Sequence, residues 1–273
     1  MQTGYSKKDR LYFEEMGSGQ PVLLLHGFGG NTYSWRFQME ILSESNRVIG
    51  LDLRGFGKSP KPDDNRYTFR DHVEMVKQFI YEMSLSHIVL VGHSYGGSIA
   101  LGLILDFKED HPEIVDKLVI IAGAAYPQHL PSLARIMRTS GIGNLTLKSL
   151  SEKKIVKWIL KQMYHKRAMI SQSTVSAYAT PLKEDHAKKI LMVTAENMIP
   201  QNPETYVKKY RNIDIPALLI WGENDSIVPL GYGRRLAKSM KNAHLKVIQE
   251  CGHIPQEEKP VDVNQFMVEF IHQ

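Results

Sequence analysis

The sequence predicts an α/β protein with a mostly parallel, doubly wound sheet and one inserted helical segment. Short aliphatic runs bounded by turn residues recur along the chain, and continuous apolar runs of this length suit strands buried on both faces. Amphipathic stretches separate these runs, and strands that alternate with helices indicate a parallel sheet covered on both sides. The runs are Val22–Leu25, Val48–Leu53, Ile88–Val91, Leu118–Ile121, Leu218–Trp221 and Leu245–Ile248.

The remaining elements follow from local patterns in chain order. Tyr12–Glu15 is expected to add an edge strand or a hairpin. Thr68–Met83 carries apolar side chains at helical spacing, and Ser98–Phe107 is small and apolar enough to form a helix packed inside the protein. Val261–Ile271 is predicted to form a final helix opened by Pro260, because proline suits the first turn of a helix.

The alternation is interrupted once, between Ala125 and Asn212. This stretch holds helical patterns broken by prolines and glycines, without a convincing buried strand, and the α/β pattern resumes at Ile215. We therefore expect a core formed by residues 1–125 and 212–273, with a helical cap inserted at 126–211.

Composition narrows the class of protein. Hydrophobic residues make up 42% and charged residues 23% of the 273 residues, which is ordinary for a soluble globular protein. The sequence offers neither an apolar run that could span a bilayer nor an apolar stretch behind the first residues that would suggest a signal peptide. Cys251 is the only cysteine, so an intrachain disulfide or a CxxC zinc site is excluded, and a cytoplasmic location is the simplest expectation.

The net charge of +5 is unevenly placed. Residues 131–211 contain 15 Lys or Arg and five Asp or Glu, a local balance of +10. The lysines fall mostly on helix-like stretches such as Glu152–Trp158, where they alternate with apolar positions, so a solvated helix face is the favoured interpretation. Attraction of anionic substrates or of a membrane surface remains an alternative, whereas we expect no nucleic-acid partner.

A candidate nucleophile lies in Gly92-His93-Ser94-Tyr95-Gly96, which matches the pattern G-x-S-x-G. The predicted strand Ile88–Val91 precedes the motif and a helical pattern follows it. A serine on such a strand-to-helix turn exposes its Oγ above the sheet edge, and the helix N-terminus behind it favours developing negative charge. The flanking glycines are expected where a side chain would clash with neighbouring backbone.

A serine hydroxyl needs a base, and the base needs an acid that orients it. Asp225 follows the strand Leu218–Trp221, and His253 follows the strand Leu245–Ile248, so both are expected at the same sheet edge as Ser94. The order Ser94, Asp225, His253 is typical of one group of serine hydrolases. Glu223 is the nearest competitor of Asp225, while His26 and His93 are expected to line the site without acting as the base.

The loop His26-Gly27-Phe28-Gly29-Gly30 follows the first buried strand and provides a candidate oxyanion hole. Its glycines allow the loop to fold over the site. The backbone N–H groups of Phe28 and Tyr95 are expected to point at the oxyanion, and losing such a donor typically costs on the order of 3 kcal/mol of transition-state stabilisation.

Together these segments resemble the α/β-hydrolase superfamily from about Tyr12 to Phe270, apart from the predicted cap. The resemblance implies a hydrolase with the catalytic triad Ser94, Asp225 and His253, and a lid at the position of the insertion. The motifs that carry it are His26–Gly30, Asp52–Ser59, Gly92–Gly97, Gly222–Asp225 and Gly252–His253.

Gly55-Phe56-Gly57-Lys58-Ser59 ends like a phosphate-binding P-loop, but Asp52 stands where that motif requires glycine. The segment is therefore expected to be a turn after a strand, with Arg54 pairing locally.

Ser94 argues against epoxide hydrolases and haloalkane dehalogenases, because members of the superfamily with those activities carry aspartate at this position. Ester hydrolysis through an acyl-enzyme, without metal or organic cofactor, is our first expectation, with a small or medium apolar acyl substrate. A C–C bond hydrolase acting on ring-cleavage products and a slow, receptor-like hydrolase remain alternatives.

Side chains of the cap are expected to set substrate choice, although ordinary packing within a helical layer would also explain them. Tyr33, after the oxyanion loop, is expected to join them, whereas Trp35 is expected to anchor a helix. The cap candidates are Met163, Tyr164, Met169, Tyr178, Met192 and Met198.

Overall fold

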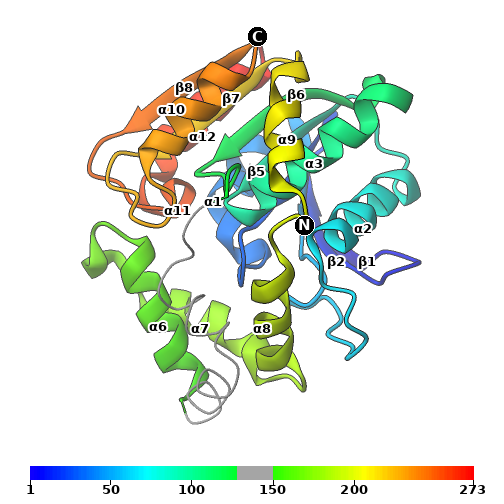
Figure 1. The fold of residues 1–273 in the computed structure, drawn as a ribbon. Coiled ribbons are helices and arrows are strands. Elements are labelled where there is room, and N and C mark those ends of the chain that lie inside the picture. Colours follow the sequence, from blue (N-terminus) through cyan, green and yellow to red (C-terminus); the bar gives the residue numbers. More distant parts are fainter. Residues whose placement is uncertain (128–149) are drawn as a thin grey trace.

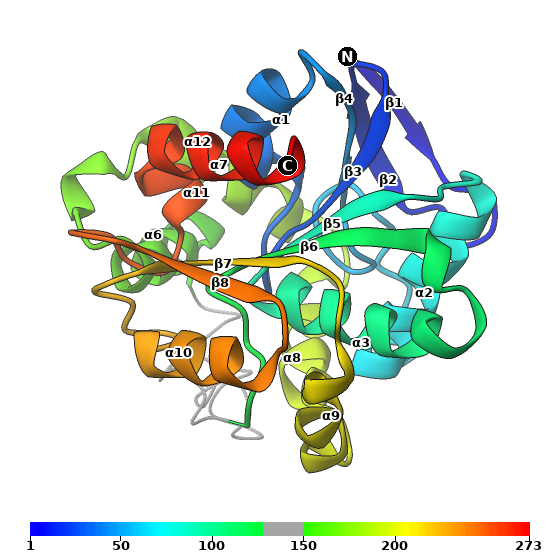
Figure 2. The ribbon, with the colours of Figure 1, turned by 90° about the horizontal axis from the view of Figure 1, so that it is seen from above.

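The structure, a computed structural model, describes residues 1–127 and 150–273. In the described residues eight strands form one sheet in the order β1-β2-β4-β3-β5-β6-β7-β8 (Figures 1 and 2). Strands β3 to β8 run parallel, whereas β1 and β2 pair antiparallel, so the predicted α/β class with a mostly parallel sheet is confirmed. The strands are β1 Gln2–Tyr5, β2 Tyr12–Met16, β3 Gln20–Leu25, β4 Asn46–Leu51, β5 Ile88–His93, β6 Val115–Ile121, β7 Ala217–Gly222 and β8 Ala243–Ile248.

Helices cover both faces of the sheet (Figure 2). One face carries α1 (Arg36–Leu42) and α12 (Pro260–Ile271), and the other carries α2 (Phe69–Glu82), α3 (Tyr95–Asp110) and α10 (Leu230–Ser239). Successive strand side chains enter opposite cores, because side chains alternate along a strand. Val22 and Leu24 of β3 pack in the core on the α1 side, whereas Leu23 and Leu25 pack in the core on the α2 side. Burying each such side chain stabilises the fold by about 1.5–3 kcal/mol.

The predicted helix at Thr68–Met83 is present as α2, and its N-terminus is capped. Thr68 accepts a hydrogen bond from the Asp71 N–H, and the Asp71 carboxylate accepts one from the Thr68 N–H, which forms a capping box. Pro260 is likewise the first residue of α12, as expected from its fixed φ.

The two edge strands of the sheet, β1 and β8, depart from the pattern of strands that are buried on both faces. The Tyr12–Glu15 segment lies in β2, which forms an antiparallel pair with β1 at one edge, so the predicted hairpin is present. The expectation that Leu245–Ile248 is buried on both faces is wrong. This segment belongs to β8 at the opposite edge, where none of the strands in residues 1–127 and 150–273 covers its outer side, and Val247 is 39% exposed.

Between β6 and β7 the described residues form helices. Residues 150–216 contain no strand, and α6, α7 and α8 face loops that follow the C-terminal ends of the parallel strands. The division into a core and a cap stays a prediction, and part of the predicted cap, 128–149, lies outside the described residues. The helices are α6 Glu152–Met163, α7 Gln172–Ala179, α8 Ala187–Asn197 and α9 Pro203–Lys209. The described residues also form short helical turns, both in this segment and outside it. They are Thr32–Trp35, Pro112–Ile114, Arg167–Met169, Thr180–Lys183, Tyr210–Asn212 and α11 (Pro255–Glu258).

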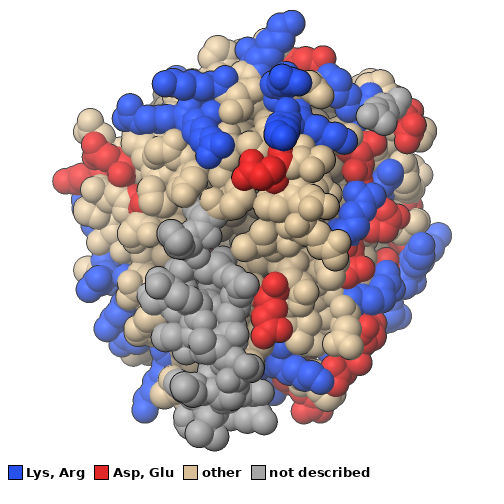
Figure 3. Space-filling model, in the orientation of Figure 1, with Lys and Arg blue, Asp and Glu red and all other residues tan. Residues whose placement is uncertain are grey.

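Lys and Arg side chains gather along the upper margin of the face in Figure 3, over the helices labelled α9 and α10 in Figure 1. Across the described parts of the chain none of these cations takes part in an ion pair. They are Lys208, Lys209, Arg211, Arg234, Arg235 and Lys238, all exposed. The lysines of α6 are also exposed while Ile155, Val156 and Leu160 are buried, as expected for a solvated helix face. None of the helices within 1–127 and 150–273 is long and apolar enough to cross a membrane.

Candidate active site

Ser94 lies on the turn between β5 and α3. Its backbone has φ 51° and ψ −113°, a conformation that L-residues rarely adopt. The turn is held in place because Ser94 N–H donates to Ile121 O of β6 at 2.9 Å, and Ser94 O accepts hydrogen bonds from Gly97 and Ala124 N–H. The strained serine is therefore fixed at the C-terminal edge of the sheet by β6, by the loop that follows β6 and by the first turn of α3.

Two glycines make this turn possible, as the sequence predicted. A Cβ atom on Gly92 would lie 2.4 Å from Gly96 O, and a Cβ atom on Gly96 would lie 2.2 Å from Leu25 O. Both distances are far below van der Waals contact. The start of α3 can therefore approach β3 and β5 only because these side chains are absent.

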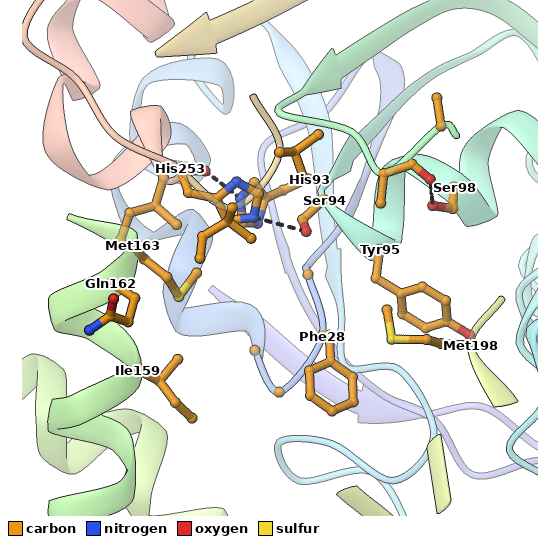
Figure 4. A pocket seen from close by; sticks show the side chains of 18 of the residues that line it. Phe28, His93, Ser94, Tyr95, Ser98, Ile159, Gln162, Met163, Met198 and His253 are labelled. Atoms are coloured by element: carbon orange, nitrogen blue, oxygen red, sulfur yellow. Dashed lines mark hydrogen bonds between the residues drawn. The ribbon is translucent and has the colours of Figure 1, made fainter. Parts of the chain in front are cut away.

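Three predicted residues come together in a chain of hydrogen bonds. His253 Nε2 lies 3.0 Å from Ser94 Oγ, and His253 Nδ1 lies 2.9 Å from Asp225 Oδ2. Figure 4 shows the His253 side chain directed at Ser94. Asp225 and His253 are 5% and 2% exposed, so the hydrogen bond between them is shielded from water. This geometry suits a nucleophile, its base and an orienting acid.

Asp225 is held by its own backbone neighbours. Its Oδ1 accepts hydrogen bonds from Ile227 and Val228 N–H, both at 2.9 Å, which leaves Oδ2 for His253. Glu223, the nearest competitor in the sequence, is exposed and no hydrogen bond joins it to His253. Geometry therefore favours Asp225.

His93 packs beside His253 with ring centroids 5.0 Å apart and lines the cavity, as expected (Figure 4). Its Nε2 donates to the His253 carbonyl oxygen at 2.9 Å. Burial holds the pKa of His93 well below its usual value, and the neighbouring His253 lowers it further. A neutral His93 is therefore a support for the His253 backbone.

Phe28 and Tyr95, whose amides are the predicted oxyanion hole, both line the cavity that contains Ser94. Tyr95 is the first residue of α3, and Gly27 packs so closely that a Cβ atom on it would lie 3.1 Å from Ser94 Cβ. Within residues 1–127 and 150–273, neither the Phe28 N–H nor the Tyr95 N–H has a hydrogen-bond acceptor. The side chain of Tyr95 is buried and lies 3.0 Å from His72 Nδ1, which anchors the residue.

His26 does not line the cavity, so its predicted contact with substrate is wrong. Its ring turns back into the protein, where Nδ1 donates to Gly27 O at 2.8 Å and Nε2 accepts from Leu53 N–H at 3.0 Å. Burial lowers the pKa of His26 to about 4. The neutral ring therefore joins the loop after β3 to the segment after β4.

The turn that resembled a P-loop uses its amides internally. Asp52 Oδ2 accepts from Lys58 N–H at 2.7 Å and Oδ1 accepts from Thr32 N–H at 2.6 Å. Arg54 pairs with Asp64, as expected from local pairing. The Lys58 N–H is thus not free to bind a phosphate.

A cavity of about 500 Å³ lies over Ser94 and His253. Most of its wall is apolar, and α6, α7 and α8 all contribute to it. Figure 4 shows Ile159, Gln162 and Met163 of α6 on one side of Ser94 and Met198 on the other. Of the described lining residues none is Lys, Arg or Asp, and Glu257 is the single acid. Gln256 also lines it, and in the described part of the chain its buried amide has no hydrogen-bond partner. Residues from the inserted segment include Val156, Ile159, Gln162, Met163, Tyr178, Leu182, Leu191 and Met198.

Several predicted pocket residues are not in this wall. Met163, Tyr178 and Met198 line the cavity, but Tyr33, Tyr164, Met169 and Met192 do not. Met169 is 44% exposed, because its helical turn lies on the outside of the inserted segment. Tyr33 packs edge-on against Tyr178 with centroids 5.8 Å apart, so it supports the wall from behind.

Tyr164 instead belongs to a buried group around Glu257, which the sequence analysis missed. Glu257 Oε2 accepts from Arg36 Nη1 at 2.7 Å and from Tyr164 Oη at 3.3 Å, and Oε1 accepts from Tyr178 Oη at 2.5 Å. Burial raises the pKa of Glu257, while Arg36 beside it acts in the opposite direction. This group joins α6 and α7 to the helix that follows His253.

The loop that carries His253 is also tied to the inserted helices. We call residues 249–254 the histidine loop. His253 N–H donates to Met163 O at 2.7 Å, and the buried Glu258 carboxylate accepts from Gly252 N–H at 2.9 Å. Cys251 is buried in this loop. The signal for Glu257 and Glu258 was two adjacent acids four and five residues after His253, but acids in a short polar helix are usually exposed.

In the part of the chain that is described, no group of three or more His, Cys, Asp or Glu side chains is placed to hold a metal ion.

Comparison with known proteins supports the fold. An uncharacterized hydrolase, YugF, of Bacillus subtilis (strain 168) is 27% identical over 252 residues, which cover 92% of this chain and 90% of that protein. A 2-hydroxy-6-oxononadienedioate/2-hydroxy-6-oxononatrienedioate hydrolase of Paraburkholderia phymatum is 29% identical and covers 97% and 91%. The solved structure of an esterase from Exiguobacterium antarcticum matches the whole of both chains with a TM-score of 0.83 at 21% identity.

A family model described as the alpha/beta hydrolase fold matches residues 20–145 and 151–260. This match includes the turn of Ser94, the loop of Asp225 and the histidine loop. The chain therefore belongs to the α/β-hydrolase family.

Proposed function

We propose that this protein is a serine hydrolase that cleaves carboxylic esters with small to medium apolar acyl groups through an acyl-enzyme. The observation that carries the proposal is the hydrogen-bonded chain Ser94–His253–Asp225 at the floor of an apolar cavity. A polar relay at the base of an otherwise apolar pocket suits a substrate whose one reactive polar group is a carbonyl.

In the first half-reaction His253 Nε2 takes the proton of Ser94 Oγ while Oγ attacks the acyl carbon. The 3.0 Å distance between these atoms allows direct proton transfer. Asp225 Oδ2 accepts the Nδ1–H bond, which fixes the ring orientation and stabilises the imidazolium that forms. The imidazolium then donates its proton to the leaving alkoxide, and the alcohol departs.

The negative charge that develops on the acyl oxygen is stabilised by the Phe28 and Tyr95 N–H groups. Tyr95 contributes as the first residue of α3, where the helix dipole also favours negative charge. Phe28 contributes from the loop that His26 pins to Leu53. Donors held by a rigid frame need no reorganisation when the charge forms.

In the second half-reaction a water molecule loses a proton to His253 Nε2 and attacks the acyl-enzyme carbonyl. The Ser94–acyl bond breaks, Ser94 regains a proton from His253, and the carboxylic acid leaves. Each turnover thus consumes one ester and one water and yields one acid and one alcohol.

The cavity wall supports neutral, apolar substrates. The described lining offers no Lys or Arg that would pair with a substrate carboxylate, and the charge of Glu257 faces Arg36. We propose that the inserted helices act as a cap that sets acyl size, with Ile159, Met163 and Met198 in the wall. A volume of about 500 Å³ accommodates a small or medium acyl ester.

The test is hydrolysis of a p-nitrophenyl ester series, from acetate to long acyl chains, by wild type, Ser94→Ala and Ser98→Ala. Ser98 lines the same cavity, but its Oγ donates to Ala124 O at 2.7 Å, so it is a matched control serine. We expect turnover by wild type and Ser98→Ala and none above background by Ser94→Ala. Equal turnover by all three proteins would refute the proposed nucleophile.

A second candidate is a C–C bond hydrolase, favoured by the similarity to a 2-hydroxy-6-oxononadienedioate/2-hydroxy-6-oxononatrienedioate hydrolase. Its substrate is an anion, and the described lining offers no cation to receive one. Spectroscopic assay with a vinylogous diketone acid separates the two candidates. Cleavage of that compound without turnover of any p-nitrophenyl ester would replace the esterase proposal.

A further inference from the structure

Glu258 is a buried carboxylate whose partners are all backbone amides. Its side chain accepts hydrogen bonds from Gly252 N–H at 2.9 Å, His165 N–H at 3.1 Å and Lys166 N–H at 2.7 Å. The residue is 2% exposed, and the described residues place no cationic side chain within ion-pair distance of it. Charge-assisted hydrogen bonds of this kind are stronger than neutral ones.

These amides belong to two segments that are far apart in sequence. Gly252 lies in the histidine loop, whereas His165 and Lys166 directly follow α6 of the inserted segment. One carboxylate therefore joins the backbone of the loop to the backbone at the end of α6. The bonded groups are main-chain atoms, so the link constrains the path of both segments.

A second, direct bond runs parallel to this link. His253 N–H donates to Met163 O, the last residue of α6, at 2.7 Å. The two segments touch so closely that a Cβ atom on Gly252 would lie 2.2 Å from Met163 O. From the opposite side, His93 Nε2 holds the His253 carbonyl oxygen at 2.9 Å. The backbone of His253 is thus clamped between α6 and the core.

The same helix forms part of the cavity wall. Ile159, Gln162 and Met163 of α6 line the cavity, and Figure 4 shows them on the side from which His253 reaches Ser94. A displacement of the end of α6 would therefore move the wall and, through Glu258 and Met163 O, the backbone of His253. A misplacement of about 1 Å at a reacting group can cost on the order of 10²-fold in rate.

We propose that Glu258 is a positioning residue that keeps His253 in register with Ser94 by fastening the histidine loop to the end of α6. This inference rests on the proposed function of the Ser94–His253–Asp225 chain. It predicts that turnover, more than substrate binding, depends on the carboxylate, because Glu258 does not itself line the cavity.

The test compares Glu258→Gln with Glu250→Gln. Glu250 lies in the histidine loop and also contacts Lys166. Its side chain is 66% exposed, and among the described residues it bonds only the Lys166 ammonium. Glu258→Gln keeps the shape of the side chain, but it turns an amide N–H toward one of the backbone N–H donors, which then loses its acceptor. For p-nitrophenyl ester hydrolysis we expect Glu258→Gln to lower kcat by about tenfold to a hundredfold with KM little changed. Glu250→Gln should leave both constants unchanged.

Amide hydrogen exchange supplies a readout that does not require activity. Glu258→Gln should speed exchange in both segments, 163–167 and 250–254, while Glu250→Gln should not. Faster exchange with unchanged kcat would overturn the positioning role, and unchanged exchange would overturn the link itself. If wild type hydrolyses no ester, the proposed function has failed and exchange alone decides whether the link exists. His165→Pro removes one donor to Glu258 and provides the same test should Glu258→Gln fail to fold.

Discussion

The buried imidazole of His26 predicts that the protein loses stability in mild acid. Its Nε2 accepts the Leu53 N–H, so a second ring proton would have to displace that hydrogen bond. Burial lowers the pKa of His26 in the folded protein from 6.5 to about 4. In the unfolded chain the ring meets water and keeps its ordinary pKa.

The sign and size of the effect follow from these two values. Because the unfolded chain binds this proton first, the free energy of unfolding falls as the pH drops from 6.5 toward 4. The difference between the two pKa values corresponds to about 3 kcal/mol, all of it lost below pH 4. Near pH 5 unfolding takes up about 0.9 of a proton at this site, a slope of about 1 kcal/mol per pH unit.

Urea unfolding at several pH values between about 7 and 4.5 measures this slope. Trp35 and Trp221 are fully buried, so their fluorescence should report the transition. We expect the slope near pH 5 to be shallower in His26→Asn than in wild type by about 1 kcal/mol per pH unit, whatever the stability of the variant at pH 7. His244→Asn is the control, because water solvates this exposed ring on β8 in both states. Identical slopes in wild type and His26→Asn would refute a neutral, buried His26.

Three further outcomes follow from the site. Gly96→Ala would place a Cβ atom 2.2 Å from Leu25 O, so we expect a loss of about 2 kcal/mol or more in unfolding free energy, and an unchanged Tm would contradict the close approach. Asp225→Asn should lower kcat for p-nitrophenyl esters by on the order of 10⁴-fold, and a loss below about tenfold would exclude Asp225 as the orienting acid. Ile159→Trp should shift the preferred acyl chain to a shorter length, and an unchanged chain-length profile would remove Ile159 from the acyl pocket.

The sheet could be predicted largely from local sequence because its central strands are buried on both faces. β3, β5 and β7 carry continuous aliphatic runs, which are typical of strands covered by helices on both faces. β8 misled the same argument, because Leu245 to Ile248 is apolar apart from Lys246, yet among the described strands it has a neighbour on one side only. β1 has no apolar run at all, and it forms through pairing with β2, which no local pattern reveals.

The candidate site, too, could be predicted only in part from local sequence. The short motifs marked Ser94, Asp225 and His253 at strand ends, and parallel strands bring such ends to one edge. The direction of individual side chains could not be predicted from the sequence. His26 turns toward Leu53, and Tyr164 turns toward Glu257. Glu258 was also missed, because two of its three partners, His165 and Lys166, follow α6, more than 90 residues earlier in the chain.

Cys251 gives the protein a reporter group of its own. It is the only thiol of the chain, it lies two residues before His253, and burial raises its pKa. Because the thiolate is the reactive form, an alkylating reagent can modify the native protein only when the surrounding chain opens. The rate of alkylation therefore measures how often the segment that carries His253 opens, without an introduced label. Any compound that seals the cavity can be recognised by how far it slows that rate.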